Sequence, residues 1–295
     1  MTTPELSVVV THSSGGADLR SALEAVHAAS AGIATEVIVA QSTGSAAAAM
    51  QVLEPDVRIV VAPSGTLVPV LWGLGAEVAV GRIVAFTTSQ MRVSADWARA
   101  LSESLRGDTV AVGGPIMPVV GASAAVTAGC LVRFSAFLPA ADAGSVTIRD
   151  VAGDNAAYLR QAVQGEGDLL REGFWEVEFH RRFHAAGRVL RTHPSANATF
   201  VGPVRLGRLL RERFAHAQEF GATRVSRHGA SRVGLLLAAP LVPLVLLARI
   251  GRRAWRIRTL RGPLLRAVPA IGLLTAAWAA GEAAGVLMAQ RPPAG

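Results

Sequence analysis

The chain contains no lysine, so arginine supplies all 29 of its basic side chains, against 21 acidic ones and a net charge of +8. Cys130 is the single cysteine, which excludes an internal disulfide and is typical of a reducing compartment. A buried small residue is its favoured interpretation over a nucleophile. Aromatic residues make up 5% of a chain that is 51% hydrophobic. The mean hydropathy of +0.39 indicates a part that faces a membrane.

Common signatures of nucleotide-binding and metal sites are missing as well. The turn "HSSGG" is not a Gly-x-Gly-x-x-Gly sequence, and no Walker loop occurs, which disfavours a dinucleotide dehydrogenase and a P-loop ATPase. His180 and His184 are four residues apart and could share a metal ion. No carboxylate stands between them, however, so two packing or solvated histidines are the favoured interpretation.

A further absence concerns the stretch "GRIVAFTTSQMRVSADW", residues 81–97. An apolar run, 83–86, predicts a buried strand, and loops that follow such strands in α/β proteins are common ligand sites. Many of these loops hold Mg²⁺ or Mn²⁺ through carboxylates. The loop here offers neutral hydroxyl and amide oxygens instead, from Thr87, Thr88, Ser89 and Gln90.

What the sequence does contain is a regular alternation of short β-rich runs with helical patterns. Strands are predicted at 6–10, 36–40, 57–61, 83–86 and 110–112, and helices at 17–30, 68–80 and 95–105, with a further small helix that follows the turn "QSTGS" and runs through Met50. This alternation predicts an α/β fold with a mostly parallel central sheet covered on both faces. A strong helix candidate, 173–187, ends at Gly187 as a plausible C-cap, and a strand at 189–191 follows it.

After Pro203 the composition changes, and the predicted domain boundaries are 1–202, 203–232 and 233–295. Residues 204–221 predict a basic amphipathic helix. Two apolar segments follow, at 233–248 and 267–289. The first, sixteen residues long, would measure about 24 Å as a helix, against a hydrocarbon core of about 30 Å. The second carries Glu282 in its interior.

Seven arginines and no acid lie between the two apolar segments. The N-terminus has no basic region of a signal peptide, so the first domain is expected in the cytoplasm. A simple hairpin would then place the basic loop outside, against the positive-inside tendency, whereas a re-entrant or interfacial first segment would keep it inside. Ordinary buried helices of a soluble domain are the alternative.

Taken in order, several blocks resemble family 2 glycosyltransferases. They are "LSVVVTHSS", "EVIVAQS", the run from "VRIVVAPSG" to "GRIVAFT", "ADWARAL", "AVGGPIMP", "GDNAAYLRQAV" and "GFWEVEFHRRFHAAG". The resemblance covers roughly residues 6–200, and the amphipathic segment and apolar tail have counterparts in membrane-bound members. It implies a GT-A fold and transfer of a sugar, with inversion, from a nucleoside-diphosphate sugar to an acceptor.

The resemblance also implies a donor site at the carboxyl ends of the first strands, with His12 among its residues. Where the family has an acidic residue that reads the base, this chain has Gln41, followed by Ser42. The metal-binding motif of the family coincides with Thr88, Ser89 and Gln90. A divalent cation is typical of the family, but the carboxylates that would bind it are missing from this motif. The sequence therefore does not say whether the protein uses a metal cofactor. Arg92 or Arg82 could neutralise the diphosphate instead.

For the acceptor side, Glu176 matches the general base of the family. Glu178 is its competitor but would point to a different helix face, and a solvent-facing structural Glu176 is the alternative. Asn155 and Tyr158 match the block that lies beside the acceptor site in the family. The equally weighted alternative is that Asn155 only starts a helix and Tyr158 only packs in the core.

Two functions remain open at this stage: a membrane-associated glycosyltransferase, and an inactive scaffold or binding module with the same fold. Retention of Glu176 favours catalysis, and the neutral residues at Gln41 and Ser89 favour the scaffold. The expected partners are a nucleoside-diphosphate sugar, membrane lipids and a lipid-linked or envelope glycan acceptor. Nucleic acid is not expected, because the arginine-rich part flanks apolar helices rather than stacking aromatics.

Overall fold

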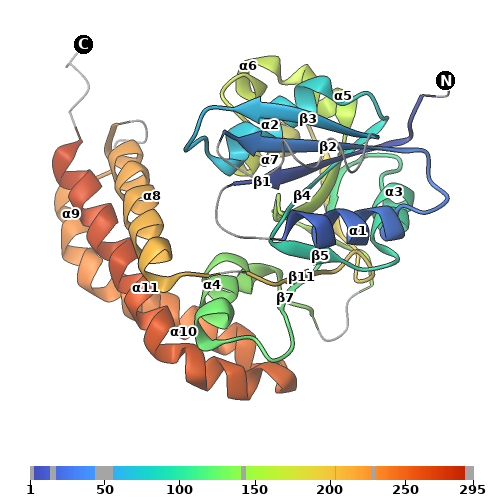
Figure 1. Ribbon diagram of the computed structural model, residues 1–295. Helices are drawn as coiled ribbons and strands as arrows, with labels where there is room; N and C mark the ends of the chain where they lie inside the picture. Colours follow the sequence, from blue (N-terminus) through green and yellow to red (C-terminus); the bar gives the residue numbers. More distant parts are fainter. Residues whose placement is uncertain are drawn as a thin grey trace, which may run out of the picture. The chain divides into compact units, whose positions relative to one another are not determined.

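The structure, a computed structural model, describes residues 3–13, 18–43, 56–140, 144–202, 204–226 and 230–289. The chain divides into two units (Figure 1). One comprises Met1–Met117 and Pro139–Pro203, and the other comprises Pro118–Leu138 and Val204–Gly295. The segment Pro118–Leu138 therefore groups with the C-terminal helices, although the sequence analysis included it in residues 1–202.

The N-terminal unit is built on an eight-stranded sheet with the order β3-β2-β1-β4-β9-β6-β10-β8. The first four strands are parallel, β9 runs antiparallel to both of its neighbours, and β10 is parallel to β6 and antiparallel to β8. The strand bounds are β1 Leu6–His12, β2 Thr35–Ser42, β3 Val57–Ala62, β4 Ile83–Thr88, β6 Thr109–Gly113, β8 Val146–Ile148, β9 Asn155–Leu159 and β10 Val189–Thr192. A small second sheet has the order β5-β11-β7, with β5 Met91–Val93, β11 Ala198–Phe200 and β7 Ile116–Pro118.

Helices cover both faces of the large sheet, because the strands are apolar on both sides. In β1, Val8 and Val10 face one core and Val9 faces the other, as the two-residue period of a strand requires. The first core is closed by α1 Leu19–Ala29 and α3 Trp97–Ser104. The second is closed by α2 Val68–Val78, α5 Arg160–Gly165, α6 Gly167–Leu170 and α7 Glu176–Ala185. The predicted fold class is confirmed.

Most predicted elements of this unit are present within a few residues of their expected bounds. Gly187 lies just past the end of α7 with φ of 69°, as a glycine cap requires. The helix predicted through Met50 lies outside the described residues. Asn155 does not start a helix but a strand, β9, whose register against β4 pairs it with Thr87. Burial of β9 between β4 and β6 overrides the helical preference of its alanines.

The C-terminal unit is helical, with α4 Ala124–Phe134, α8 Leu206–Ser226, α9 Arg232–Ala238, α10 Val242–Trp255 and α11 Arg261–Met288. Among the described residues, two stretches are long and apolar enough to cross a membrane, by length and composition alone. Arg232–Trp255 has a mean hydropathy of 2.3 and is 6% buried, and Arg258–Met288 has a mean hydropathy of 1.5 and is 44% buried.

The greater burial of α11 comes from α8, which packs along it through glycines. A Cβ atom at Gly285 would lie 1.8 Å from the Gln218 carbonyl oxygen, and one at Gly221 would lie 2.2 Å from the Glu282 carbonyl oxygen. The two backbones therefore approach as closely as small residues permit. At the same seam Arg224 donates to the Glu282 carboxylate at 2.5 Å, which gives the charge inside the apolar segment a partner.

We expect Gly285→Ala to lower the melting temperature of the protein, because the added methyl group would displace α8. Overpacking of this kind costs about 1–3 kcal/mol or more. Gly272→Ala, on the same helix, meets nothing within 4 Å and should leave the melting temperature unchanged or raise it slightly, since alanine favours a helix. Thermal unfolding in detergent, followed by far-UV circular dichroism, compares the two variants. Equal melting temperatures would contradict the close packing.

Candidate functional site

A buried polar edge forms where β1, β2 and β4 end. The parallel registers place His12 beside Gln41 and Thr11 beside Thr88. Each of the side chains at this edge is less than 9% exposed: His12, Gln41, Ser42, Thr88 and Ser89. The structure therefore brings together the residues that the sequence assigned to the donor site at the ends of these strands.

Hydrogen bonds connect β1 to the loop after β4. His12 Nδ1 lies 3.0 Å from Ser89 Oγ, and the Ser89 amide donates to the Thr11 carbonyl oxygen at 2.9 Å. The Gln90 amide donates to Thr88 Oγ1 at 3.3 Å. Burial lowers the pKa of His12, so the ring is neutral at pH 7 and contributes a hydrogen bond rather than a charge.

Positive charge is supplied beside this edge by Arg92 in β5. Its guanidinium donates to the carbonyl oxygens of Ser89 and Met91 at 3.1 and 2.9 Å, and to the carbonyl oxygen of Asp18 at 3.1 Å. The Asp18 carboxylate lies 3.8 Å away. Burial lowers the pKa of Arg92 and the charge of Asp18 opposes the shift. The guanidinium is thus held in one place next to Ser89.

Arg82, the other candidate for the diphosphate, lies at the opposite edge of the sheet. It precedes β4 and pairs with Glu5, which precedes β1, at 2.7 Å. Six residues of β4, at about 3.3 Å each, separate it from Ser89. Of the two arginines, Arg92 is therefore the one that lies beside Ser89.

Glu176 is the first residue of α7 and borders an aromatic cluster beneath the end of β4. The Phe174 ring lies 4.5 Å from Phe86 of β4 and 4.9 Å from Tyr158, centroid to centroid. Burial raises the pKa of Tyr158, and the charge of Glu176 adds to the shift, so the carboxylate lies near that ring. Glu178 instead pairs with Arg181. Glu176 and Glu178 are both half-buried, and Glu176 is the one whose charge reaches Tyr158.

A hydrogen-bonded chain fixes α7 against β9. The Tyr158 hydroxyl lies 3.0 Å from His180 Nε2, and His180 Nδ1 lies 3.2 Å from Asp150 Oδ1. Burial lowers the pKa of His180 to about 4, so the ring is neutral at pH 7, donates from Nδ1 and accepts from the hydroxyl. His184 contacts the carbonyl oxygen of Arg149 at 2.7 Å. The two histidines therefore have separate partners.

The two residues predicted beside the acceptor are both fully buried. Trp97 Nε1 donates to Asn155 Oδ1 at 2.6 Å, and Asn155 Nδ2 donates to the carbonyl oxygens of Pro115 and Ala196 at 3.2 and 2.9 Å. Tyr158 is held in the aromatic cluster. Contact with an acceptor stays a prediction for both, and neither side chain exposes an atom to meet one.

Asp154 is a buried acidic residue near this edge that is not among the residues predicted from the sequence. It is 7% exposed and precedes Asn155, whose register partner is Thr87, so it lies at the edge where β4 ends. Gly153 beside it is pressed against Trp72, whose ring would lie 2.8 Å from a Cβ atom there. Asp154 belongs to the sequence block "GDNAAYLRQAV". Its place beside the end of β4 follows only from the observation that β9 is a strand.

The three described residues that end β4 do not by themselves fit a divalent cation, and Asp154 is a carboxylate that lies near them. Thr88, Ser89 and Gln90 offer neutral oxygens, whereas Mg²⁺ and Mn²⁺ favour carboxylates. Across the described ranges, no group of three or more His, Cys, Asp or Glu side chains comes together.

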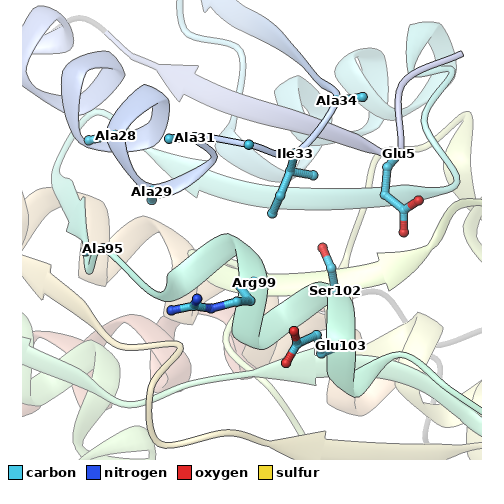
Figure 2. Close-up of a pocket in the computed structure, with 11 residues that line it drawn as sticks. Glu5, Ala28, Ala29, Ala31, Ile33, Ala34, Ala95, Arg99, Ser102 and Glu103 are labelled. Carbon is cyan, nitrogen blue, oxygen red and sulfur yellow. The ribbon is translucent and has the colours of Figure 1, made fainter. Parts of the chain in front are cut away.

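A separate cavity of about 570 Å³ lies at the opposite, amino edge of the parallel strands. Figure 2 shows Glu5 and Ile33 on one side of it and Arg99, Ser102 and Glu103 of α3 on the other. None of the predicted site residues lines this cavity.

No known family model and no curated protein matches the chain. Solved structures do. GalNAc-T7 with UDP, GalNAc and Mn²⁺ is similar over 69% of this chain and 45% of its own, with 12% identity and a TM-score of 0.51. The mannosyltransferase PcManGT from Pyrobaculum calidifontis, with GDP-Man and Mn²⁺, is similar over 97% of this chain and 87% of its own, with 16% identity and a TM-score of 0.53. The chain thus spans less than half of the length of GalNAc-T7, and its fold is that of GT-A-type glycosyltransferases.

The neutral state of His180 predicts a pH dependence of stability. The pKa of His180 is about 4 in the folded protein and 6.5 ordinarily, so the unfolded chain binds an extra proton between these values. Stability therefore falls as the pH drops from about 6.5 to 4, by up to about 1.4 kcal/mol per unit. Urea unfolding at pH 7, 6 and 5 should show a shallower dependence for His180→Gln than for the wild type. His184→Gln, which alters an exposed ring, should keep the full slope, and equal slopes in all three proteins would refute this assignment.

Proposed function

We propose that the N-terminal unit is a family 2 type glycosyltransferase that moves a sugar from a nucleoside-diphosphate sugar to an acceptor hydroxyl with inversion. The observation that carries the proposal is the polar edge of β1, β2 and β4, in a fold shared with two nucleotide-bound transferases. Gln41 and Ser42 would bind the nucleotide. His12, Ser89 and Gln90 would border the diphosphate.

The proposed reaction is a single displacement. Glu176 removes the proton of the acceptor hydroxyl, and the resulting oxygen attacks the anomeric carbon on the face opposite the nucleoside diphosphate. The bond from carbon to the diphosphate oxygen breaks, its electron pair stays on the diphosphate, and the configuration inverts. The proton stays on Glu176 until solvent takes it.

Arg92 would offset the negative charge that develops on the leaving diphosphate. A guanidinium suits phosphate geometry, and the carbonyl oxygens of Ser89 and Met91 orient this one in advance. Each ~1.4 kcal/mol of such stabilisation is worth about tenfold in rate.

We further propose that the C-terminal unit attaches the protein to a membrane, with the N-terminal unit in the cytoplasm and a lipid-linked or envelope acceptor. The stretch Arg232–Trp255 leaves large apolar side chains exposed, at 67% for Val233, 75% for Leu237 and 64% for Leu244. The arginines between Arg249 and Arg266 would meet anionic headgroups.

The second candidate is a scaffold that keeps the fold without catalysis. The neutral residues at the end of β4 favour it, because both similar structures hold Mn²⁺. Calorimetry separates the two functions. Absence of binding of any nucleoside-diphosphate sugar, with or without Mn²⁺, would support the scaffold.

Glu176→Gln should lower the rate of nucleoside-diphosphate release in the presence of acceptor by about 10²–10⁴-fold, the usual contribution of a general base. Donor binding should change less than twofold, since the amide keeps the size of the side chain. Glu178→Gln is the matched control, two positions on in the same helix, and should retain full turnover. If Glu176→Gln turned over like the wild type, the base assignment would be wrong.

Arg92→Gln should weaken the binding of UDP or GDP about tenfold or more, as expected for loss of a charge-assisted phosphate contact. Arg82→Gln removes the same charge at the opposite edge and should bind like the wild type. Isothermal titration calorimetry with and without EDTA measures both effects. Binding that EDTA abolishes, or that Arg92→Gln leaves intact, would contradict the role of the guanidinium.

A further inference from the structure

Two helices of the C-terminal unit bring basic side chains together. Gly129 of α4 lies against α8, where its Cβ atom would be 3.4 Å from the Leu209 side chain. Arg133 and Arg213 each follow four residues on in these two contacting helices. The charge of Arg133 acts on Arg213, so the two guanidinium groups lie within electrostatic reach of each other.

Arg213 is an unusual member of this pair because much of its side chain is covered. Its guanidinium lies over the Trp278 ring of α11, 4.2 Å from the centroid. Its Nε atom is buried and has no hydrogen-bond partner within the described part of the chain. Burial, and next the charge of Arg133, lower the pKa of Arg213 to about 10. A buried donor without an acceptor costs free energy that a bound anion would recover.

His216 joins the cluster from the next turn of α8, with its ring 6.4 Å from Trp278. Burial lowers its pKa, the charges of Arg213 and Arg133 lower it further, and Glu219 opposes them. Other acids nearby are already engaged, because Glu212 pairs with Arg208 and Glu282 pairs with Arg224.

We propose that Arg133, Arg213 and His216 form a binding site for a phosphate monoester, with Trp278 as its apolar wall. Two guanidinium groups match phosphate geometry, and a doubly charged anion relieves the repulsion between them. A lipid phosphate headgroup and a free phosphate share this chemistry. The inference does not depend on glycosyl transfer, since every residue belongs to the C-terminal unit.

The test uses the full chain purified in a neutral detergent, with two probes: phosphatidic acid in detergent micelles and inorganic phosphate. Calorimetry measures both, and native mass spectrometry counts lipid adducts. We expect Arg213→Gln and Arg133→Gln each to weaken phosphatidic acid binding about tenfold or more. Arg208→Gln is the matched control in α8, since it removes an exposed arginine paired with Glu212, and should change binding less than twofold.

Each outcome decides the proposal. Binding of phosphatidic acid without binding of millimolar phosphate assigns the site to a lipid headgroup, and equal sensitivity of both probes to the variants assigns it to a free anion. Equal affinity of Arg208→Gln, Arg213→Gln and Arg133→Gln would overturn the site. If Arg213→Gln does not fold, as judged by far-UV circular dichroism, binding is measured with Arg133→Gln and Arg213→Lys instead. Arg213→Lys keeps the positive charge but lacks the planar guanidinium group.

Discussion

The in-register parallel pairing of β1 with β2 on one side and β4 on the other is the constraint on which the site depends. It satisfies the backbone of three buried strands and makes them end together, with His12 beside Gln41 and Thr11 beside Thr88. The polar side chains at the ends of these strands cannot move apart unless the backbone hydrogen bonds between the strands break. A shift of one residue would turn them into the apolar cores, which cover both faces.

The turn that follows β4 carries no carboxylate of its own, and Arg92 lies beside it. In a metal-dependent site, acidic side chains and a diphosphate repel each other until a cation lies between them. With Thr88 and Ser89 at the end of β4, these two positions add no such repulsion, and in the proposed function the guanidinium of Arg92 would meet the phosphates directly. The backbone carbonyls of Ser89 and Met91 orient the guanidinium of Arg92, and the Asp18 carboxylate 3.8 Å away offsets part of its charge. In the proposed function, the neutral turn after β4 and this arginine act together on the diphosphate.

The sequence predicts the parallel strands well, because their apolar runs and following polar turns are local signals. It does not predict β9, since "NAAYL" has no β-branched residue and forms a strand through pairing with β4 and β6. That error also hid Asp154. The position of Gln41 could be foreseen from the resemblance. The burial of Asn155 and Tyr158 could not, because it depends on partners such as Trp97 and His180, far away in the sequence.

The two apolar stretches of the C-terminal unit differ for a physical reason that composition does not reveal. The second carries Gly281, Gly285 and Glu282, which give α8 a close backbone contact and an ion pair with Arg224. Its apolar surface is thus partly used within the protein, and it is 44% buried. The first stretch has no such polar or glycine contacts along Val233 to Leu244, and 6% of it is buried. Its exposed leucines and valines would be stabilised by hydrocarbon rather than water, which makes this stretch, despite being the shorter one, the stronger argument for a bilayer.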